Sequence, residues 1–408
     1  MKKIVALILS GLLLFVAGCG DTGALSSSSI SDMDSVQTGD VSSVTSGVSQ
    51  TETGTTTEVT AASTTTGQKT SAKATASDNA AATTTLQEQV YIPTMPTSAL
   101  ASNQRQLIPD NDFYYGLTVR SQKDHSNGDA FSDLGQFQYR TKSGTPSWII
   151  AQWDSGPCLW KDRVQSAANV LTDGLTKWVT YLKDDGISLR LNSAPYYATK
   201  PNKAAAAGDY WPHLLLEAPD FGYSSLGKKE RSWYRCDMDN LTLSMDVRLS
   251  AYNYVANPHD YAHVCQYLMY FYVKGVQSSD FVWFGVTLFY SEQEKTGLSV
   301  HMDGGKADAS GQLIYQIGTD ACYAQADGSL WKNGKPAPGE KWVHIEMDMS
   351  KHLKEMYAAA QEKDYFSNKV SSLGDLLIDG MNVGFESVGT YDVTMDIRNL
   401  SLISTREN

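Results

Sequence analysis

Two carboxylates and a histidine share one face of a predicted strand. His344, Glu346 and Asp348 alternate with apolar residues, and alternate residues of a strand point to the same side, about 7 Å apart. Carboxylates this close could act as the acid and the nucleophile of a retaining glycosidase, which needs a separation of about 5–5.5 Å. Glu386 and Asp396 join them as candidates because their strands could pair nearby. The simpler interpretation is a solvated strand face whose charges keep it soluble.

Aromatic side chains are the most abundant signal. The chain has 22 Tyr and 9 Trp, and each of them lies at or after Tyr91. Sugar rings stack on aromatic planes, while their hydroxyls pair with planar polar groups such as those of Asn, Gln, Asp and Glu. Most tryptophans in any protein belong to its core, but we expect two or three here to line a groove. The candidate substrate-binding residues are Gln152, Trp153, Trp211, His213 and Trp283.

Metal sites have weaker support. His259 and His263 are four residues apart, as in a zinc-binding helix, but the preceding Asn-Pro favours a loop. Asp237, Asp239 and Asn240 offer the oxygen ligands that calcium prefers, although a solvated turn is the more common explanation of such a cluster. We therefore expect no cofactor, with structural calcium as the one metal that the sequence suggests.

Several function classes lack support. The chain carries a formal net charge of −12, which disfavours binding to nucleic acid and to anionic lipid. The sequence holds no phosphate-binding glycine loop, no dinucleotide fingerprint and no G-x-S-x-G motif. An acidic chain of this kind suits neutral ligands.

The elements that must position these residues are mainly strands. Apolar and polar residues alternate in 241–250, 343–350 and 392–398, which is typical of half-buried strands, while 266–274 and 281–290 are apolar on both faces. Residues 351–365 form the clearest helical segment, with Ser350 as N-cap, and 162–178 a weaker one. Many strands and one or two short helices predict an all-β fold, a two-sheet antiparallel sandwich or jelly roll.

The first nineteen residues have the pattern of an export signal. A basic start, Met1 to Lys3, precedes an apolar run from Ile4 to Phe15, which is shorter than the roughly 20 residues of a membrane span. The run ends in Val-Ala-Gly before Cys19 and resembles the lipobox of bacterial lipoproteins. That resemblance implies cleavage before Cys19 and acylation of Cys19, which would anchor the chain to the bacterial cell surface. The alternative is an ordinary signal peptide with a chance cysteine.

Composition divides the rest of the chain in two. Of residues 21–85, 30 are Ser or Thr and none is aromatic, so we expect residues 20–85 to be a disordered tether. Residues 86–408 then form one β-sandwich domain. The domain holds Cys158, Cys236, Cys265 and Cys322, which could form two disulfides in any of three pairings or stay as four thiols.

Three segments carry a resemblance to a known family. They are Trp148 to Trp153, Trp211 to Glu217, and Asn382 to Glu386 with the following Tyr391 to Leu400. The chain resembles extracellular lipoproteins of gut bacteria that are similar to the concanavalin A-like lectin/glucanase jelly rolls. The resemblance implies a glycan-related role. The E-x-D-x-x-E strand of β-glucan hydrolases in that superfamily is missing, because Glu346-Met347-Asp348 lacks the final glutamate.

Three hypotheses follow. The leading one is a cell-surface lipoprotein whose jelly roll binds a polysaccharide or glycan. The alternative is a glycoside hydrolase or polysaccharide lyase that uses the carboxylates on the same face. The third is an adhesion module for another surface protein. In each case we expect a monomer that touches the membrane only through its lipid anchor.

Overall fold

The computed structural model describes residues 100–120, 133–139, 145–152, 159, 164–183, 186–198, 212–255, 264–292, 296–304 and 310–407. Several predictions lie outside these residues: the export signal with Cys19, the tether, Trp153 and Trp211, and the pair His259 and His263. No helix in the described ranges has the length and apolar character that a membrane crossing requires.

Most of the described residues belong to two large sheets. Sheet A has the strand order β17-β10-β19-β8-β7-β6-β5, and β1 pairs with β19 beside it. Each neighbouring pair is antiparallel. Its strands are β1 (Gln104–Gln106), β5 (Val164–Ala167), β6 (Val170–Thr172), β7 (Lys177–Tyr181), β8 (Ile187–Asn192), β10 (Asn240–Tyr254), β17 (Val343–Asp348) and β19 (Tyr391–Thr405).

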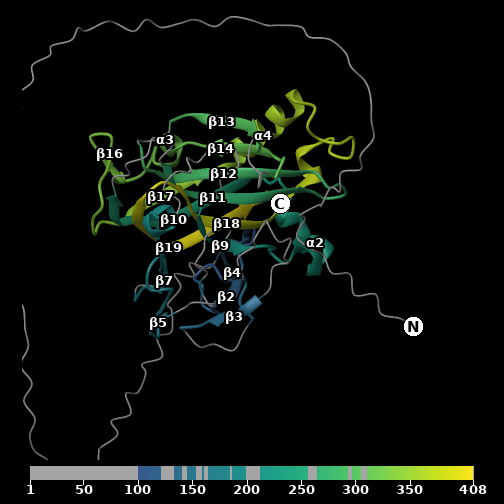
Figure 1. Cartoon of the computed structure of the whole chain (residues 1–408). Coiled ribbons are helices and arrows are strands. Elements are labelled where there is room, and N and C mark those ends of the chain that lie inside the picture. Colours follow the sequence, from purple (N-terminus) through teal and green to yellow (C-terminus); the bar gives the residue numbers. More distant parts are fainter. Residues whose placement is uncertain are drawn as a thin grey trace, which may run out of the picture. The chain divides into compact units, whose positions relative to one another are not determined.

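Sheet B is the larger of the two and faces the viewer in Figure 1. Its order is β13-β14-β12-β11-β18-β9-β4-β2-β3, and it is antiparallel except for the parallel pairs β12–β14 and β2–β4. Its strands are β2 (Leu117–Arg120), β3 (Asp133–Phe137), β4 (Trp148–Ala151), β9 (His213–Ala218), β11 (Val264–Gly275), β12 (Phe281–Tyr290), β13 (Leu298–Met302), β14 (Leu313–Ile317) and β18 (Leu376–Val388). A separate hairpin pairs β15 (Trp331–Lys332) with β16 (Lys335–Pro336).

The two sheets pack face to face over one hydrophobic core. Alternate residues of β10, from Leu241 to Leu249, are buried in it together with those of β17 and β19. From the other layer, β11 contributes Tyr267, Met269 and Phe271 to the same core. This arrangement confirms the predicted all-β two-sheet sandwich, including each strand that the alternating and doubly apolar patterns predicted.

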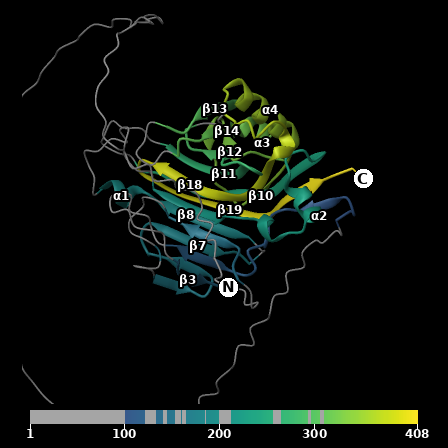
Figure 2. The same ribbon diagram turned by 90° about the vertical axis from the view of Figure 1, so that its right-hand side faces the viewer.

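Helices occupy the edges of the sandwich. The longest, α4 (Met349–Glu362), follows β17 directly and buries Leu353 and Met356 in the core. Figure 2 shows α4 beside β13 and β14, away from α2. The shorter helices are α1 (Ala194–Ala198), α2 (Lys228–Arg231) and α3 (Thr319–Cys322), with 3-10 turns η1 (Tyr223–Ser225), η2 (Ser232–Tyr234) and η3 (Leu373–Asp375).

Two local predictions were wrong. The proposed helix at 162–178 is instead β5, β6 and the start of β7. The turn between β6 and β7 is held by the Asp173 carboxylate, which accepts the backbone N–H groups of Leu175, Thr176 and Lys177. The N-cap of α4 is Asp348, whose carboxylate accepts the Ser350 N–H at 2.8 Å, so Ser350 lies inside the helix.

The structure also decides the state of three cysteines. Cys236, Cys265 and Cys322 are buried free thiols, while Cys158 lies outside the described residues. Every way of forming two disulfides from four cysteines pairs two of these three, so the two-disulfide alternative is excluded. Burial raises the pKa of the Cys265 thiol to about 12, which leaves it protonated and unreactive.

Candidate functional site

The predicted site residues are divided between the two outer faces of the sandwich. Glu346 and Asp348 belong to β17 in sheet A. Glu386, His213 and Trp283 belong to β18, β9 and β12 in sheet B. The expectation that Glu386 joins Glu346 and Asp348 was therefore wrong, because β17 and β18 are in different sheets. Asp396, on β19, lies on the same outer face as Glu346 but pairs with Arg248 on β10.

On sheet A, one candidate carboxylate caps a helix and the other is exposed to solvent. Asp348 caps α4 as described above and also accepts the Ser350 hydroxyl. Glu346 is exposed on the outer face, opposite Ser244 of β10. Asp348 thus has a structural role at the start of α4, and a catalytic role for Glu346 and Asp348 stays a prediction. The structure thus favours the simpler interpretation of this strand, a solvated polar face.

The rest of the outer face of sheet A is a network of paired charges. Arg248 and Arg398 lie over the Trp342 ring at 4.5 and 4.2 Å from its centroid. Their carboxylate partners are Asp396, 2.7 Å from Arg248, and Asp246, 3.0 Å from Arg398. Burial raises the pKa of Asp246, but hydrogen bonds from His344, Asn399 and Arg398 outweigh it and leave that pKa lowered. These charges satisfy one another.

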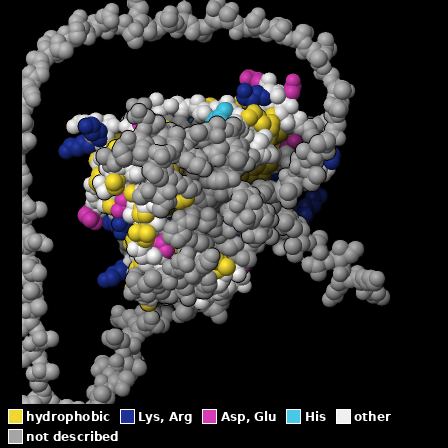
Figure 3. All heavy atoms as spheres, in the orientation of Figure 1, with side chains coloured by type: hydrophobic (Ala, Val, Ile, Leu, Met, Phe, Trp, Pro, Cys, Tyr) yellow, Lys and Arg dark blue, Asp and Glu magenta, His cyan; other side chains and the backbone are white. Residues whose placement is uncertain are grey.

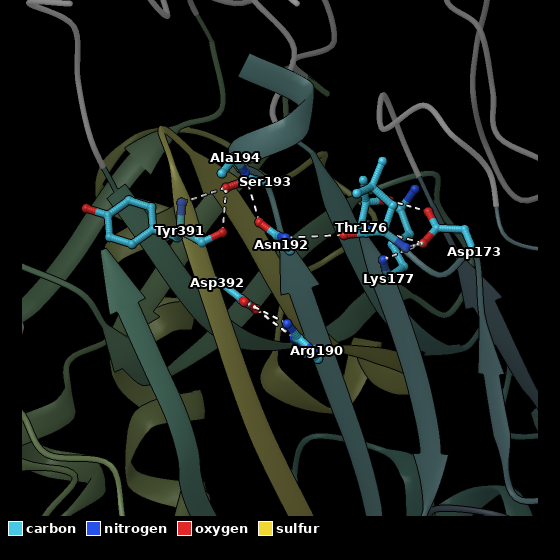
Figure 4. A network of polar contacts seen from close by, with 10 residues as sticks. Asp173, Thr176, Lys177, Arg190, Asn192, Ser193, Ala194, Tyr391 and Asp392 are labelled. Carbon is cyan, nitrogen blue, oxygen red and sulfur yellow. Dashed lines mark hydrogen bonds and ion pairs between the residues drawn. The ribbon is translucent and has the colours of Figure 1, made fainter. Parts of the chain in front are cut away.

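The same pairing recurs near the β7–β8 end of that face. Figure 4 shows Arg190 on β8 reaching Asp392 on β19, with two hydrogen bonds of 2.7 Å each. The Arg190 guanidinium also lies 4.0 Å from the centroid of the Trp178 ring. The two hydrogen bonds and the ring hold the Arg190 guanidinium in one position, and the Asp392 carboxylate already balances its charge. Sheet A therefore has a polar and partly aromatic outer face, and arginines cover Trp178 and Trp342 on it.

The outer face of sheet B carries a different set of side chains, arranged in rows across neighbouring strands. One row consists of Gln266 on β11, Glu386 on β18 and His213 on β9, which are direct partners in the strand register. The Gln266 amide donates to a Glu386 carboxylate oxygen at 3.0 Å, and the other oxygen lies 3.5 Å from His213 Nε2. The row presents an amide, a carboxylate and an imidazole together.

A second row lies four residues further along the strands. It joins Tyr270 on β11, Asn382 on β18 and Glu217 on β9. The Asn382 amide donates to the Tyr272 hydroxyl at 3.5 Å, and this hydroxyl donates to a Glu217 oxygen at 2.9 Å. The other Glu217 oxygen lies 3.8 Å from the Arg120 guanidinium of β2. Four strands thus contribute to one polar cluster.

Glycines allow the two tyrosine rings to lie across neighbouring strands. A Cβ on Gly285 of β12 would lie 2.3 Å from the Tyr270 ring, and one on Gly380 of β18 would lie 2.7 Å from the Tyr272 ring. Gly380 also has φ of +138°, which side-chain-bearing residues rarely adopt. The Tyr272 ring passes over Gly380 and so carries its hydroxyl from β11 to Glu217 on β9.

Four aromatic rings gather beside this cluster. Trp283 makes edge contacts with Phe281, Tyr272 and Tyr270, at centroid distances of 4.7, 5.2 and 5.8 Å. Its indole N–H donates to the Ser310 hydroxyl at 2.9 Å. Trp283 and Phe281 are half-buried and none of the four belongs to the core between the sheets. Trp283 thus lies on the outer face of sheet B beside polar groups, and its substrate-binding role stays a prediction.

Burial shapes the electrostatics of the Glu217 cluster. The Glu217 side chain is only about a tenth exposed, at 9%. Burial raises its pKa, although the Tyr272 hydrogen bond and the positive charges of Arg120 and Lys274 partly oppose this. Lys274 itself lies 3.6 Å from Asp379. The outer face of sheet B therefore holds a carboxyl group that keeps its proton more readily than an ordinary glutamate.

Gln152 is buried and hydrogen-bonds to the backbone of neighbouring segments. It is fully buried at the end of β4, its amide donates to the Arg120 carbonyl, and its side-chain oxygen accepts the Leu159 N–H at 2.7 Å. Its bonds to the backbone tie β4 to β2, and its substrate-binding role stays a prediction.

The sequence reasoning missed Glu217, Tyr272 and Asn382. Each is a polar group inside a strand that is mostly apolar on both faces, as in His213–Ala218. That contrast was the available signal, since a polar residue in such a strand must find a buried partner. The exposed alternation of β17 drew attention to sheet A instead.

The calcium prediction has no support in the described residues. Asp237 pairs with Arg406, and Asp239 accepts the Glu407 N–H. Across the described ranges no three His, Cys, Asp or Glu side chains come together as a metal site would require.

No protein-family model matches the chain, and neither does any curated protein. Solved structures with similar arrangements include the family 11 xylanase from Neocallimastix patriciarum, at 12% identity over 60% of this chain and 89% of that chain, with a TM-score of 0.29. A family 12 xyloglucanase from Bacillus licheniformis covers 60% of this chain and 97% of its own at 10% identity and a TM-score of 0.31. The xyloglucanase domain of the Sinorhizobium fredii effector NopAA, in complex with cellobiose, aligns over 64% of this chain and 94% of its own, at 10% identity and a TM-score of 0.29. At these TM-scores the likeness identifies neither the family nor the activity of this chain.

Proposed function

We propose that the protein binds a polysaccharide or glycan on the outer face of sheet B. The observation that carries the proposal is the pairing of two kinds of group on that face. Planar polar side chains, Gln266, Glu386, Asn382 and Glu217, are held in fixed hydrogen bonds, and the rings around Trp283 lie beside them.

This combination matches the chemistry of a sugar. Side-chain amides donate and accept hydrogen bonds and carboxylates accept them, as sugar hydroxyls require, while aromatic rings offer apolar planes for the C–H faces. Figure 3 shows acidic and basic side chains of both signs at the rim of this view. The groups that this proposal rests on are the planar polar side chains and the rings, which suit a ligand recognised by its hydroxyls and ring faces.

Hydrolysis has less support from the geometry. Glu386 is opposite His213 and Glu217 is opposite Asn382. The Cα atoms of the two glutamates are therefore offset by four residues along the strands, which is about 13 Å. Retaining glycosidases need about 5–5.5 Å between carboxyl groups, and inverting ones about 6.5–9.5 Å. Tyr272 also holds Glu217 on the side away from Glu386. We therefore place binding ahead of catalysis.

The test compares two tryptophans on opposite faces. The intact protein is run by affinity electrophoresis through gels that contain neutral plant and bacterial polysaccharides. Trp283→Ala should weaken retention about five- to tenfold, since aromatic contacts contribute about 1–1.5 kcal/mol. Trp342→Ala, on sheet A, is the matched control and should leave retention unchanged. Gln266→Ala, which removes an amide and no ring, should also weaken retention.

Two outcomes would count against the proposal. One is an absence of retention on every polysaccharide, and the other is loss of retention in Trp342→Ala but not in Trp283→Ala. Release of reducing ends from a retained polysaccharide, abolished by Glu217→Gln, would favour the hydrolase instead.

We further propose that the chain reaches its ligand as a lipoprotein on the bacterial cell surface. The pattern that ends at Cys19 supports this. Metabolic labelling with a fatty acid should mark the protein, and Cys19→Ser should remove both the label and the membrane association. A labelled Cys19→Ser variant would contradict this assignment.

A further inference from the structure

A pocket opens where the strands of sheet B end, beside α2. Its volume is about 650 Å³, within the roughly 300–1,000 Å³ of small-molecule sites. It is lined by Tyr223, Leu226, Lys228, Arg231, Ser232, Arg235, Val276 and Gln277. Val276 and Gln277 follow directly on β11, and Figure 1 shows α2 beside the ends of these strands.

The lining of this pocket contains three cations and no carboxylate. Lys228, Arg231 and Arg235 form no ion pair with any carboxylate of the described residues. The nearest acid along the chain, Glu230, pairs with Arg105 at 3.4 Å. Three unpaired positive charges around one pocket stand out in a chain of net charge −12.

Backbone carbonyls hold the two arginines in place. Arg231 donates to the carbonyls of Leu226 and Ser224, at 2.8 and 2.7 Å. Arg235 donates to the Gly374 carbonyl at 2.6 Å. A neutral carbonyl orients a guanidinium without cancelling its charge, so both groups are positioned before a ligand arrives.

We infer that this pocket binds an oxyanion carried by a saccharide, a carboxylate or a sulfate. The inference rests on the proposed function, since the acidic group belongs to the glycan that sheet B binds. Guanidinium groups recognise both oxyanions by paired hydrogen bonds. The apolar Leu226 and Val276 supply contacts that a sugar ring needs. The Tyr223 ring lies 5.3 Å from the Arg231 guanidinium and helps to position it.

Adjacent lysines give a matched test. Lys228 lines the pocket and Lys229 does not, while both are exposed residues of α2. The intact protein is run at low ionic strength through gels with polygalacturonate, dextran sulfate or uncharged dextran. Lys228→Gln should weaken retention on the preferred acidic polymer about threefold, and Arg235→Gln about tenfold. Lys229→Gln should change it less than about twofold, as expected for an exposed charge outside the site.

The two acidic polymers identify the group: stronger retention on polygalacturonate assigns a carboxylate, and stronger retention on dextran sulfate assigns a sulfate. Equal losses in Lys228→Gln and Lys229→Gln would overturn the inference, because they would reflect diffuse charge. So would equal retention on acidic and uncharged polymers. If neutral glycans are retained through Trp283 in that case, the proposed function survives and only the pocket assignment fails.

Discussion

Replacing Tyr272 with Phe removes one oxygen from the outer face of sheet B and leaves its ring in place. That hydroxyl lies 2.9 Å from a Glu217 oxygen, and the remaining partner of that carboxylate is Arg120 at 3.8 Å. A hydrogen bond to a charged group contributes about 1.5–3 kcal/mol, and one between neutral groups about 0.5–1.5 kcal/mol. We therefore expect the loss of stability in Tyr272→Phe to depend on the charge of Glu217.

The sign of the pH dependence follows from the raised pKa of Glu217. Its folded-state pKa lies above the ordinary 4.5 because of burial, so stability falls as pH rises from 4.5 toward the folded value. The Tyr272 hydrogen bond lowers that pKa. Its removal therefore raises the pKa further and extends to higher pH the range over which stability falls. The difference between wild type and variant should grow with pH, from about 1 kcal/mol near pH 4.5 to about 2–3 kcal/mol near pH 8.

Urea unfolding of both proteins at the two pH values measures this difference, and the subtraction cancels titrations that they share. Tyr270→Phe is the matched control, since Tyr270 lies on the same strand face and its hydroxyl is expected to contribute little. A loss of stability in Tyr272→Phe that is equal at both pH values would refute the reasoning. An equal loss in Tyr270→Phe would do so as well.

Three further predictions concern single residues. Gly380→Ala should destabilise the fold by at least about 2 kcal/mol in urea unfolding, because a Cβ would meet the Tyr272 ring at 2.7 Å and backbone oxygens at 2.8 Å, with φ at +138°. Burial raises the pKa of Asp110 to about 7 from 3.8, so stability should fall as pH rises between these values, and Asp110→Asn should flatten that slope; an unchanged slope contradicts the assignment. Asp348→Ala should reduce stability by about 1 kcal/mol through loss of the α4 cap, whereas Glu346→Ala should stay within about 0.5 kcal/mol.

The strands were predictable because burial repeats locally. In β10, β17 and β19 every second residue meets the core, and the chain itself records that period. Residues 162–178, which were wrongly predicted to be helical, show no such repeat over their whole length. The turn between β6 and β7 in this segment depends on how the Asp173 carboxylate accepts three N–H groups. Side chains that close a turn are visible in a sequence, but their geometry is not.

The site was only partly predictable. Trp283 and His213 were placed among the candidates from their type and neighbours, and both lie on the outer face of sheet B. Glu346 and Glu386 have the same chemistry in the sequence, yet the strand order puts them in different sheets. Glu217 and Tyr272 are 55 residues apart in the chain, and no local pattern relates them.

By itself the sequence determined the alternation of its strands, the composition break at residue 85 and the supply of aromatic and planar polar groups. These are properties of neighbouring residues, and periodicity and composition express them directly. Tertiary structure alone decided which face each strand shares with which others, because sheet order comes from long-range pairing. That pairing brought Gln266, Glu386 and His213 into one row, joined Tyr272 to Glu217 over Gly380, and left the carboxylates of β17 on the far side of the sandwich.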